Sequence, residues 1–196
     1  MSASMTSHDD AMRAAIAEAE RARGKTGDNP WVGCVIVDGH GQIVARGHTQ
    51  GPGEDHAEIV AMQDAVRLGI SLAEATLYST LEPCAFHGRT PACAKAIVTR
   101  GVRRVVTGIL DPNPRVDGVG LSMLREAGVE VVPDVCAAEI TRQLAPWIFR
   151  FHPHEPARFA AGVAEPERMA ILTARYGVSE AEVREVLVRG GFSPGS

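Results

Sequence analysis

The chain has 196 residues, of which 45% are hydrophobic and 22% charged, and this balance predicts a folded globular protein instead of a disordered one. Its net charge is −4, and only 5% of its residues are aromatic. A general nucleic-acid binder presents a basic surface with interleaved aromatic side chains, so the composition argues against that class. No apolar stretch approaches the roughly 20 residues that cross a bilayer.

The N-terminal segment and the number of cysteines indicate the cellular compartment of the protein. Asp9 and Asp10 stand where a secretory signal carries basic residues, and no apolar segment follows them, so we expect a cytoplasmic protein. Four cysteines are too few for a disulfide scaffold in a chain of this length. Metal binding or burial is therefore expected for them.

The first third of the chain predicts two helices and a hairpin. Residues 8–23 are rich in Ala, Glu and Arg, with apolar residues at helical spacing. Two β-rich runs, 31–37 and 42–48, flank a Gly-containing turn and predict a hairpin. A second helix is expected over 57–68, with Gly69 after it.

Strand and helix patterns then alternate, which predicts parallel strands joined by right-handed crossovers. The strands are expected over 75–81, 102–110 and 129–133, and the helices over 91–101, 120–128 and 135–151. Pro146 should kink or end the last helix. We therefore expect an α/β protein, a three-layer α/β/α sandwich whose mixed five-stranded sheet consists of the hairpin and three further strands.

The C-terminal residues differ in composition from the rest. Residues 152–167 contain three prolines among small residues and predict a linker. Two short helices are expected over 167–177 and 179–191, the second capped by Ser179 with Glu182 three residues on. We divide the chain into a domain at 1–151 and a short helical extension at 152–196.

Three segments contain the residue types of a catalytic zinc site. His56 and Glu58 stand at the start of a predicted helix, Cys84 follows a strand, and Cys93 lies in the first turn of the next helix. One imidazole and two thiolates form a recognised zinc set that leaves a fourth position for water. Zinc lowers the pKa of such a water toward neutrality. Glu58 is better suited to carry the proton of the water to a leaving ammonia than to bind the metal.

Taken singly, these residues are more often structural than functional. Cys84 and Cys93 could be buried small side chains, and His56 could cap its helix. His-x-Glu followed by Pro-Cys is, however, the signature of zinc deaminases. The two cysteines are separated here by eight residues, whereas that signature has two between them.

The sequence around this motif resembles one family. The runs LYSTLEPCAFHGRTPACAKAI, DPNPRVDGVG and REAGVEV, with NPWVGCVIV and HAEIVAM before them, resemble the deaminase domain of riboflavin biosynthesis. That family deaminates 2,5-diamino-6-ribosylamino-4(3H)-pyrimidinone 5′-phosphate. The resemblance covers residues 8–151 and implies a cytidine-deaminase-like fold, one Zn²⁺ per chain and a homo-oligomer.

The resemblance also implies roles for single residues. It implies that Glu58 is the proton shuttle and that the zinc ligands are His56, Cys84 and Cys93. It implies that Asn29 and His48 contact the pyrimidine or the ribose of the substrate.

Phosphate recognition is implied for three further residues. Arg89 lies in a Gly-flanked loop between two metal ligands, and a guanidinium matches phosphate bidentately. Asp111 and Asn113 become candidate contacts to the sugar phosphate. The alternatives are a solvated loop charge for Arg89 and turn chemistry around two prolines for Asp111 and Asn113.

Two positions depart from the family pattern, which has His where Phe86 stands and Pro where Ala92 stands. The bifunctional form of the family continues into a reductase domain, whereas the residues after Phe151 are too few for one and lack a dinucleotide-binding motif. We therefore expect a separate reductase to carry out the next step.

Four functions remain open. The sequence favours a zinc-dependent hydrolytic deaminase of a small phosphorylated aminopyrimidine, with neither nucleic acid nor membrane as partner. Another heterocycle, such as a pathway-specific pyrimidine, a pterin or a purine, is the main alternative. A nucleic-acid editing deaminase conflicts with the charge of −4. A non-catalytic, zinc-stiffened interaction module conflicts with a ligand set of three, because structural zinc sites normally have four protein ligands.

Overall fold

The structure is a computed structural model that describes residues 6–86, 92–159, 161–164 and 167–190. Contacts within the chain divide it into two compact units, Met1–Ala137 and Ala138–Ser196. The first unit contains the whole sheet, and the second is helical. No helix in the described ranges has both the length and the apolar character that crossing a membrane requires.

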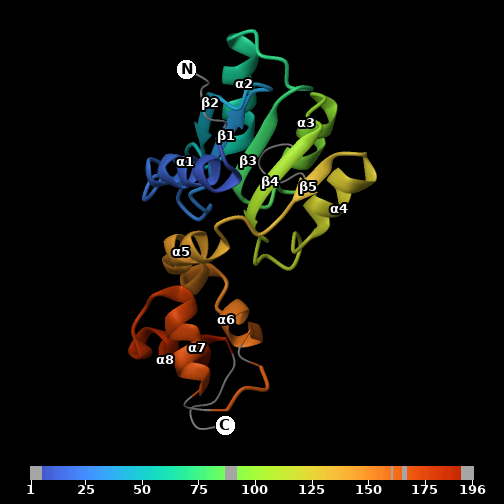
Figure 1. The fold of residues 1–196 in the computed structure, drawn as a ribbon. Coiled ribbons are helices and arrows are strands. Elements are labelled where there is room, and N and C mark those ends of the chain that lie inside the picture. The colour runs from blue at the N-terminus through green and yellow to red at the C-terminus, as the bar shows by residue number, and fades with distance from the viewer. Residues whose placement is uncertain (1–5, 87–91, 160, 165–166, 191–196) are drawn as a thin grey trace. The chain divides into compact units, whose positions relative to one another are not determined.

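The first unit alternates helices and strands in the order that the sequence predicts (Figure 1). Its helices are α1 (His8–Glu20), α2 (Ala57–Arg67), α3 (Cys93–Thr99) and α4 (Val119–Glu126). Its strands are β1 (Gly33–Val37), β2 (Ile43–His48), β3 (Thr76–Leu81), β4 (Arg104–Ile109) and β5 (Glu130–Val132).

The five strands form one mixed sheet in the order β2-β1-β3-β4-β5. Strand β1 pairs antiparallel with both β2 and β3, whereas β3, β4 and β5 run parallel. The parallel strands are connected through α3 and α4, as expected for crossover connections. The prediction of a hairpin followed by three parallel strands is confirmed.

Two glycines place helices on opposite faces of this sheet. A Cβ at Gly33 would lie 1.9 Å from the carbonyl oxygen of Ala15 in α1. A Cβ at Gly47 would lie 2.4 Å from the carbonyl oxygen of Ala57 in α2. Gly47 pairs with Cys34, the neighbour of Gly33, and adjacent residues of a strand point to opposite faces. Helices α1 and α2 therefore cover opposite faces.

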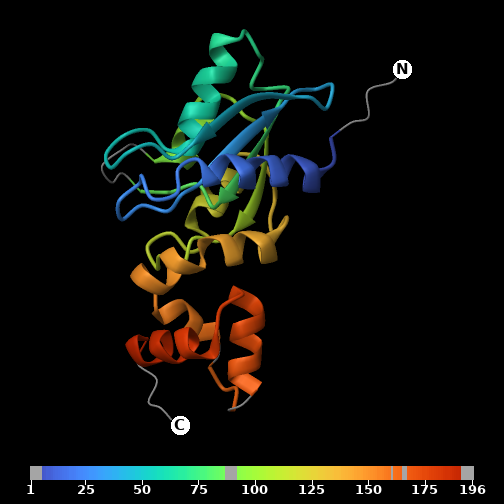
Figure 2. The same cartoon turned by 90° about the vertical axis from the view of Figure 1, so that its left-hand side faces the viewer.

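Helix α3 contacts both α2 and α4, so these three helices form one layer and α1 forms the other (Figures 1 and 2). The predicted three-layer α/β/α sandwich is confirmed. Its core is built from fully buried aliphatic side chains of all three layers, among them Met12, Ile36, Leu77, Ile97 and Leu124.

The second unit corrects two expectations about prolines. Helix α5 (Ala137–Phe151) continues through Pro146, so the expectation that this proline could end the helix is wrong. Pro146 and Arg142 are exposed, so the Arg142 carbonyl that loses its helical donor can bond to water. Helix α6 (His154–Phe159) lies in the segment expected to be a linker. Its Pro156 stands in the first turn, where a missing N–H does not break the helix.

Helices α7 (Glu167–Tyr176) and α8 (Glu180–Arg189) lie where the sequence predicts them. Ser179 caps α8 and forms the expected capping box with Glu182. Each helix buries an apolar stripe, which includes Met169 and Leu172 in α7 and Val183 in α8.

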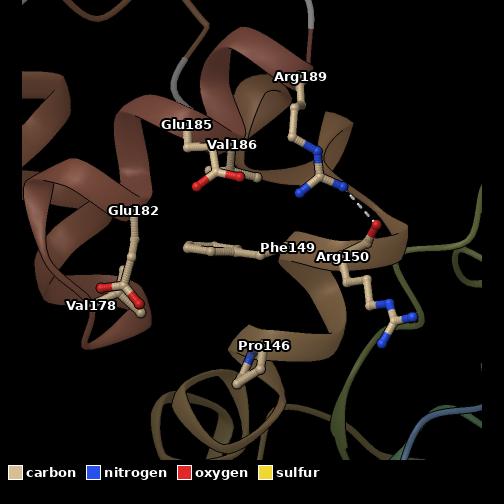
Figure 3. Close-up of a pocket in the computed structure, with 8 residues that line it drawn as sticks. All are labelled: Pro146, Phe149, Arg150, Val178, Glu182, Glu185, Val186 and Arg189. Atoms are coloured by element: carbon tan, nitrogen blue, oxygen red, sulfur yellow. Dashed lines mark hydrogen bonds between the residues drawn. The ribbon is translucent and has the colours of Figure 1, made fainter.

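Helices α5 and α8 of this unit line a pocket of about 250 Å³ (Figure 3). Phe149 points into the space between the two helices, and the carboxylates of Glu182 and Glu185 face the same space. Arg189 closes one side by donating to the carbonyl oxygen of Arg150 at 2.8 Å.

Candidate metal centre and active site

His56 is positioned by the start of α2. It is the N-cap residue, with an extended backbone at φ −75° and ψ 161°, and its side chain makes no capping hydrogen bond. Its Nδ1 atom instead lies 3.3 Å from Cys93 Sγ and 3.7 Å from Cys84 Sγ. The alternative that the imidazole caps the helix is therefore not what the structure shows.

Cys84 and Cys93 lie on either side of the connection between β3 and α3. Cys84 follows β3, and Cys93 is the first residue of α3. The backbone amide of Cys93 donates to Cys84 Sγ at 3.3 Å, and that of Ala94 donates to the Cys84 carbonyl at 3.1 Å. These bonds hold the start of α3 against Cys84 and bring both sulfurs to His56.

The three side chains fit a zinc ion. Their ligand atoms all lie within 4.8 Å of one another, and no other metal-ligating group of three occurs in the described residues. Zn–N and Zn–S bonds in a tetrahedral site place nitrogen and sulfur about 3.6 Å apart. The two observed separations, 3.3 and 3.7 Å, lie on either side of that value.

Hydrogen bonds within this cluster shift the pKa values of the two thiols and the imidazole. The hydrogen bond from the Cys93 thiol lowers the pKa of Cys84 to about 4, although burial opposes the shift. The same hydrogen bond and burial raise the pKa of Cys93 well above its usual value. The hydrogen bond to Cys84 also raises the pKa of His56. A cation bound here would displace protons, because it binds thiolates and neutral imidazole.

Glu58 lies in the first turn of α2, two residues after His56, and is 4% exposed. Burial raises the pKa of its carboxyl to about 7, with His56 acting in the opposite direction. Near neutral pH such a carboxyl can both accept and return a proton. Cys34, whose pKa is raised by burial and by Glu58, is fully buried in β1, as expected for a core residue.

Asn29 and His48 lie at the sheet edge that carries the cysteines. Because β1 is antiparallel to β2 and β3, the start of β1 shares this edge with the ends of β2 and β3. His48 ends β2, and its Nδ1 atom lies 2.8 Å from the buried carboxylate of Glu18. Since a carboxylate accepts, a neutral His48 presents Nε2 as an acceptor. Asn29, in the loop before β1, is half-buried.

Asp111 and Asn113 follow β4 at the same edge. Asp111 Oδ1 accepts the amide of Asn113 at 2.8 Å, and Asn113 Oδ1 accepts the amide of Arg115 at 3.1 Å. The turn chemistry considered as the alternative for these residues is therefore present. Burial, together with the charges of Glu82 and Cys84, raises the pKa of Asp111 to about 6. Arg89 lies outside the described residues.

Sequence reasoning missed Glu82, which stands between β3 and Cys84. It is 3% exposed, and its carboxylate accepts backbone N–H groups from the segment after β4. The signal for it was an ionisable residue at the end of an apolar strand, directly before Pro83 and a metal ligand. A charge in that position must be compensated by the fold.

Phe86, one of the two departures from the family pattern, is 36% exposed. The guanidinium carbon of Arg115 lies 5.5 Å from the centre of its ring, within the range of a cation–π contact. Phe86, two residues after Cys84, therefore places an aromatic ring and the guanidinium of Arg115 next to each other.

Comparison with known proteins agrees with this geometry. Residues 5–109 match the family model of the cytidine and deoxycytidylate deaminase zinc-binding region. The chain is 41% identical over 152 residues to the riboflavin biosynthesis protein RibD of Aquifex aeolicus, which covers 76% of this chain and 42% of that protein. It is 49% identical over 120 residues to RibD of Escherichia coli, covering 61% of this chain and 32% of that protein. The chain thus spans less than half the length of either relative.

Solved structures support the fold. The structure matches Acinetobacter baumannii RibD with a TM-score of 0.65 and 40% identity, over 70% of this chain and 38% of that one. It matches a diaminohydroxyphosphoribosylaminopyrimidine deaminase/5-amino-6-(5-phosphoribosylamino)uracil reductase from Thermotoga maritima with a TM-score of 0.66 and 37% identity. That match covers 71% of this chain and 40% of that one. The expected cytidine-deaminase-like fold is confirmed.

Proposed function

Because the chain belongs to the family of the cytidine and deoxycytidylate deaminase zinc-binding region, we propose that it is a zinc-dependent hydrolytic deaminase of an aminopyrimidine nucleotide. The proposed substrate is 2,5-diamino-6-ribosylamino-4(3H)-pyrimidinone 5′-phosphate of riboflavin biosynthesis. The observation that carries the proposal is a three-ligand zinc set beside a buried carboxylate, in a chain similar to RibD proteins along most of its length.

His56, Cys84 and Cys93 would hold the metal. When bound by three protein ligands, zinc lowers the pKa of a coordinated water toward neutrality and so supplies a nucleophile at physiological pH. Glu58 would accept the proton of the attacking water and deliver it to the amino group as the C–N bond breaks. The products are then ammonia and the corresponding carbonyl compound.

We assign substrate contacts to the residues at the same sheet edge. His48, oriented by Glu18, would offer Nε2 to a donor on the pyrimidine or ribose, and Asn29 would contact the same part of the substrate. Asp111 and Asn113 would contact the sugar phosphate through the atoms that their turns leave available. Arg89 would bind the phosphate.

We further propose a catalytic domain at residues 1–151, with 152–196 as an extension, and a homo-oligomeric assembly. The similarity to RibD of Aquifex aeolicus extends over 152 residues, which is close to the length of the proposed domain. Light scattering of the purified zinc-loaded protein tests the assembly, and a monomeric mass contradicts it.

A deaminase of another heterocycle remains the second candidate, and Phe86 favours it. A phenyl ring offers an apolar face to a planar substrate, whereas the His of the family pattern offers a hydrogen bond. An assay of ammonia release against a panel of aminopyrimidine nucleotides, pterins and purines separates the two. Turnover of the diaminopyrimidine nucleotide supports the riboflavin assignment. Turnover of another heterocycle alone removes it.

A further inference from the structure

We propose that Glu82 is a positioning residue, which fixes residues 111–121 beside the zinc ligands so that Asp111 and Asn113 face the substrate. The role in turnover rests on the function proposed above. The structural part of the inference, that one carboxylate ties this segment to the metal-ligand segment, stands on the contacts alone.

The contacts of Glu82 converge on one segment. Its side chain lies between β3 and the zinc ligand Cys84 and is buried. The carboxylate accepts four backbone amides, from Asp111 at 3.2 Å, Gly118 at 2.9 Å, Gly120 at 2.8 Å and Leu121 at 3.3 Å. A buried carboxylate is tolerated only when such donors replace water, so these bonds and the burial depend on each other.

The glycines of the segment allow this approach. A Cβ at Gly120 would lie 2.0 Å from the carbonyl oxygen of Pro83 and 3.1 Å from Glu82 Oε1. Gly118 has a φ of 91°, a left-handed conformation that a side chain would strain. The start of α4 therefore lies directly against the two residues that precede Cys84.

The segment also holds its own shape. The side chains of Asp111 and Asn113 each accept an amide two residues further on, and Arg115 contacts the ring of Phe86. A movement at the Glu82 carboxylate would therefore carry the whole segment with it. The Glu82 carboxylate bonds to backbone amides of this segment, and for that reason we describe its role as positioning.

The experiment replaces Glu82 by Gln in the full-length, zinc-loaded protein. The amide keeps the size of the side chain but removes the charge and turns one acceptor into a donor that faces backbone N–H groups. We expect hydrogen exchange to show lost protection at residues 111–121, with one zinc still bound per chain. We expect kcat/KM to fall about 100-fold, mostly through KM, as for a misplacement of substrate-positioning groups.

Glu126→Gln is the matched control. Glu126 is the exposed last residue of α4, so this change removes one carboxylate charge from the helix that Glu82 contacts, without touching the four amides. It should keep the exchange pattern, the zinc content and the kinetics of the wild type. Equal exchange and equal KM in Glu82→Gln and Glu126→Gln would overturn the proposal.

A double-mutant cycle separates positioning from general damage. If Glu82 acts through Asn113, Glu82→Gln should raise KM much less in an Asn113→Ala background than in the wild type. Fully additive effects on KM would overturn the positioning role. If the wild type deaminates no pyrimidine nucleotide, the proposed function fails, while hydrogen exchange still tests the tie between Glu82 and the segment.

Two variants cover the case in which Glu82→Gln does not fold. Glu82→Asp keeps the charge on a shorter side chain and should retain part of the protection and of the activity. Gly120→Ala leaves Glu82 intact but adds the Cβ that Pro83 excludes, so it should reproduce the loss of protection. Wild-type exchange and wild-type KM in both variants would overturn the proposal.

Discussion

The two units of the chain bury their polar groups differently. In the described residues, the three buried carboxylates, Glu18, Glu58 and Glu82, all lie in the first unit. Arg168 is the buried charged side chain described in the second unit, and its Nε donates to the carbonyl oxygen of Val163 at 2.9 Å. Burial of a carboxylate is costly without donors. In the first unit, such buried carboxylates lie near the sheet edge where we place the deaminase site.

The comparison indicates where substitutions change activity and where they change only stability. Helices α7 and α8 are held by apolar stripes, and ion pairs such as Glu155–Arg158 lie between residues close in sequence. Such pairs contribute little to stability. Changes at the buried carboxylates of the first unit should therefore alter turnover, and changes in the apolar core of the second unit should alter stability alone.

The largest effect is expected for Glu58→Gln. The variant should retain one zinc per chain and lose ammonia release by about 100-fold to 10,000-fold, the usual contribution of general acid–base catalysis. Elemental analysis and a turnover assay on the same sample measure both quantities. Glu54→Gln, at an exposed position before α2, is the control. Substantial activity in Glu58→Gln would contradict the proton-shuttle role.

Leu172→Ala should produce the opposite result in the second unit. Leu172 is fully buried, and a Leu→Ala change in a core costs about 2–5 kcal/mol of unfolding free energy. Denaturant unfolding followed in the second unit should show that loss, with zinc content and turnover unchanged. Val188→Ala, at an exposed position of α8, should have a much smaller effect. A loss of turnover in Leu172→Ala would break the division between the units.

Arg89→Ala should discriminate between substrates with and without a phosphate. A charge-assisted hydrogen bond from a guanidinium to phosphate contributes about 1.5–3 kcal/mol. We expect kcat/KM to fall for the phosphorylated pyrimidine by the corresponding factor and to stay nearly constant for its dephosphorylated form. Arg46→Ala, at an exposed position of β2, is the control. Equal losses on both substrates would remove Arg89 from the phosphate site.

The smallest effect is expected from deletion of residues 155–196. The deletion removes α7, α8 and all of α6 except His154, and it leaves the sheet and the zinc ligands in place. If the extension is dispensable, the shortened protein should remain soluble, bind one zinc per chain and retain its turnover. An insoluble or metal-free product would show that the first unit depends on the second.

Most of the first unit could be predicted from the sequence. Its strands are short apolar runs bounded by turns, and its helices end at glycines such as Gly69 and Gly101, so local patterns decide each element. The zinc ligands were predicted because three residue types recur in a fixed order that the chemistry requires. The helix α6 was not predicted, because its Pro156 stands in a segment where prolines indicate a linker.

The partners of the buried carboxylates could not be predicted. Glu82 bonds to amides 29 to 39 residues further along the chain, and Glu18 bonds to His48 across the start of the sheet. Such contacts depend on how strands and loops meet in three dimensions, and no local pattern carries that information. Asp111 and Asn113 were predictable in part. Their turns involve neighbouring residues, so the sequence could indicate them, whereas the proximity of Asp111 to Cys84 depends on the fold.

The close approach of α2 to Gly47 sets a limit on the redesign of this protein. Because α2 carries Glu58 and has His56 as its N-cap, a side chain at position 47 would collide with the start of α2 and displace both residues. A mutant library that seeks new heterocyclic substrates would gain nothing from diversity at this position. Positions 86 and 115, which are exposed, can instead be varied without moving the helix. Directed evolution could thus change the substrate range while the metal frame stays constant.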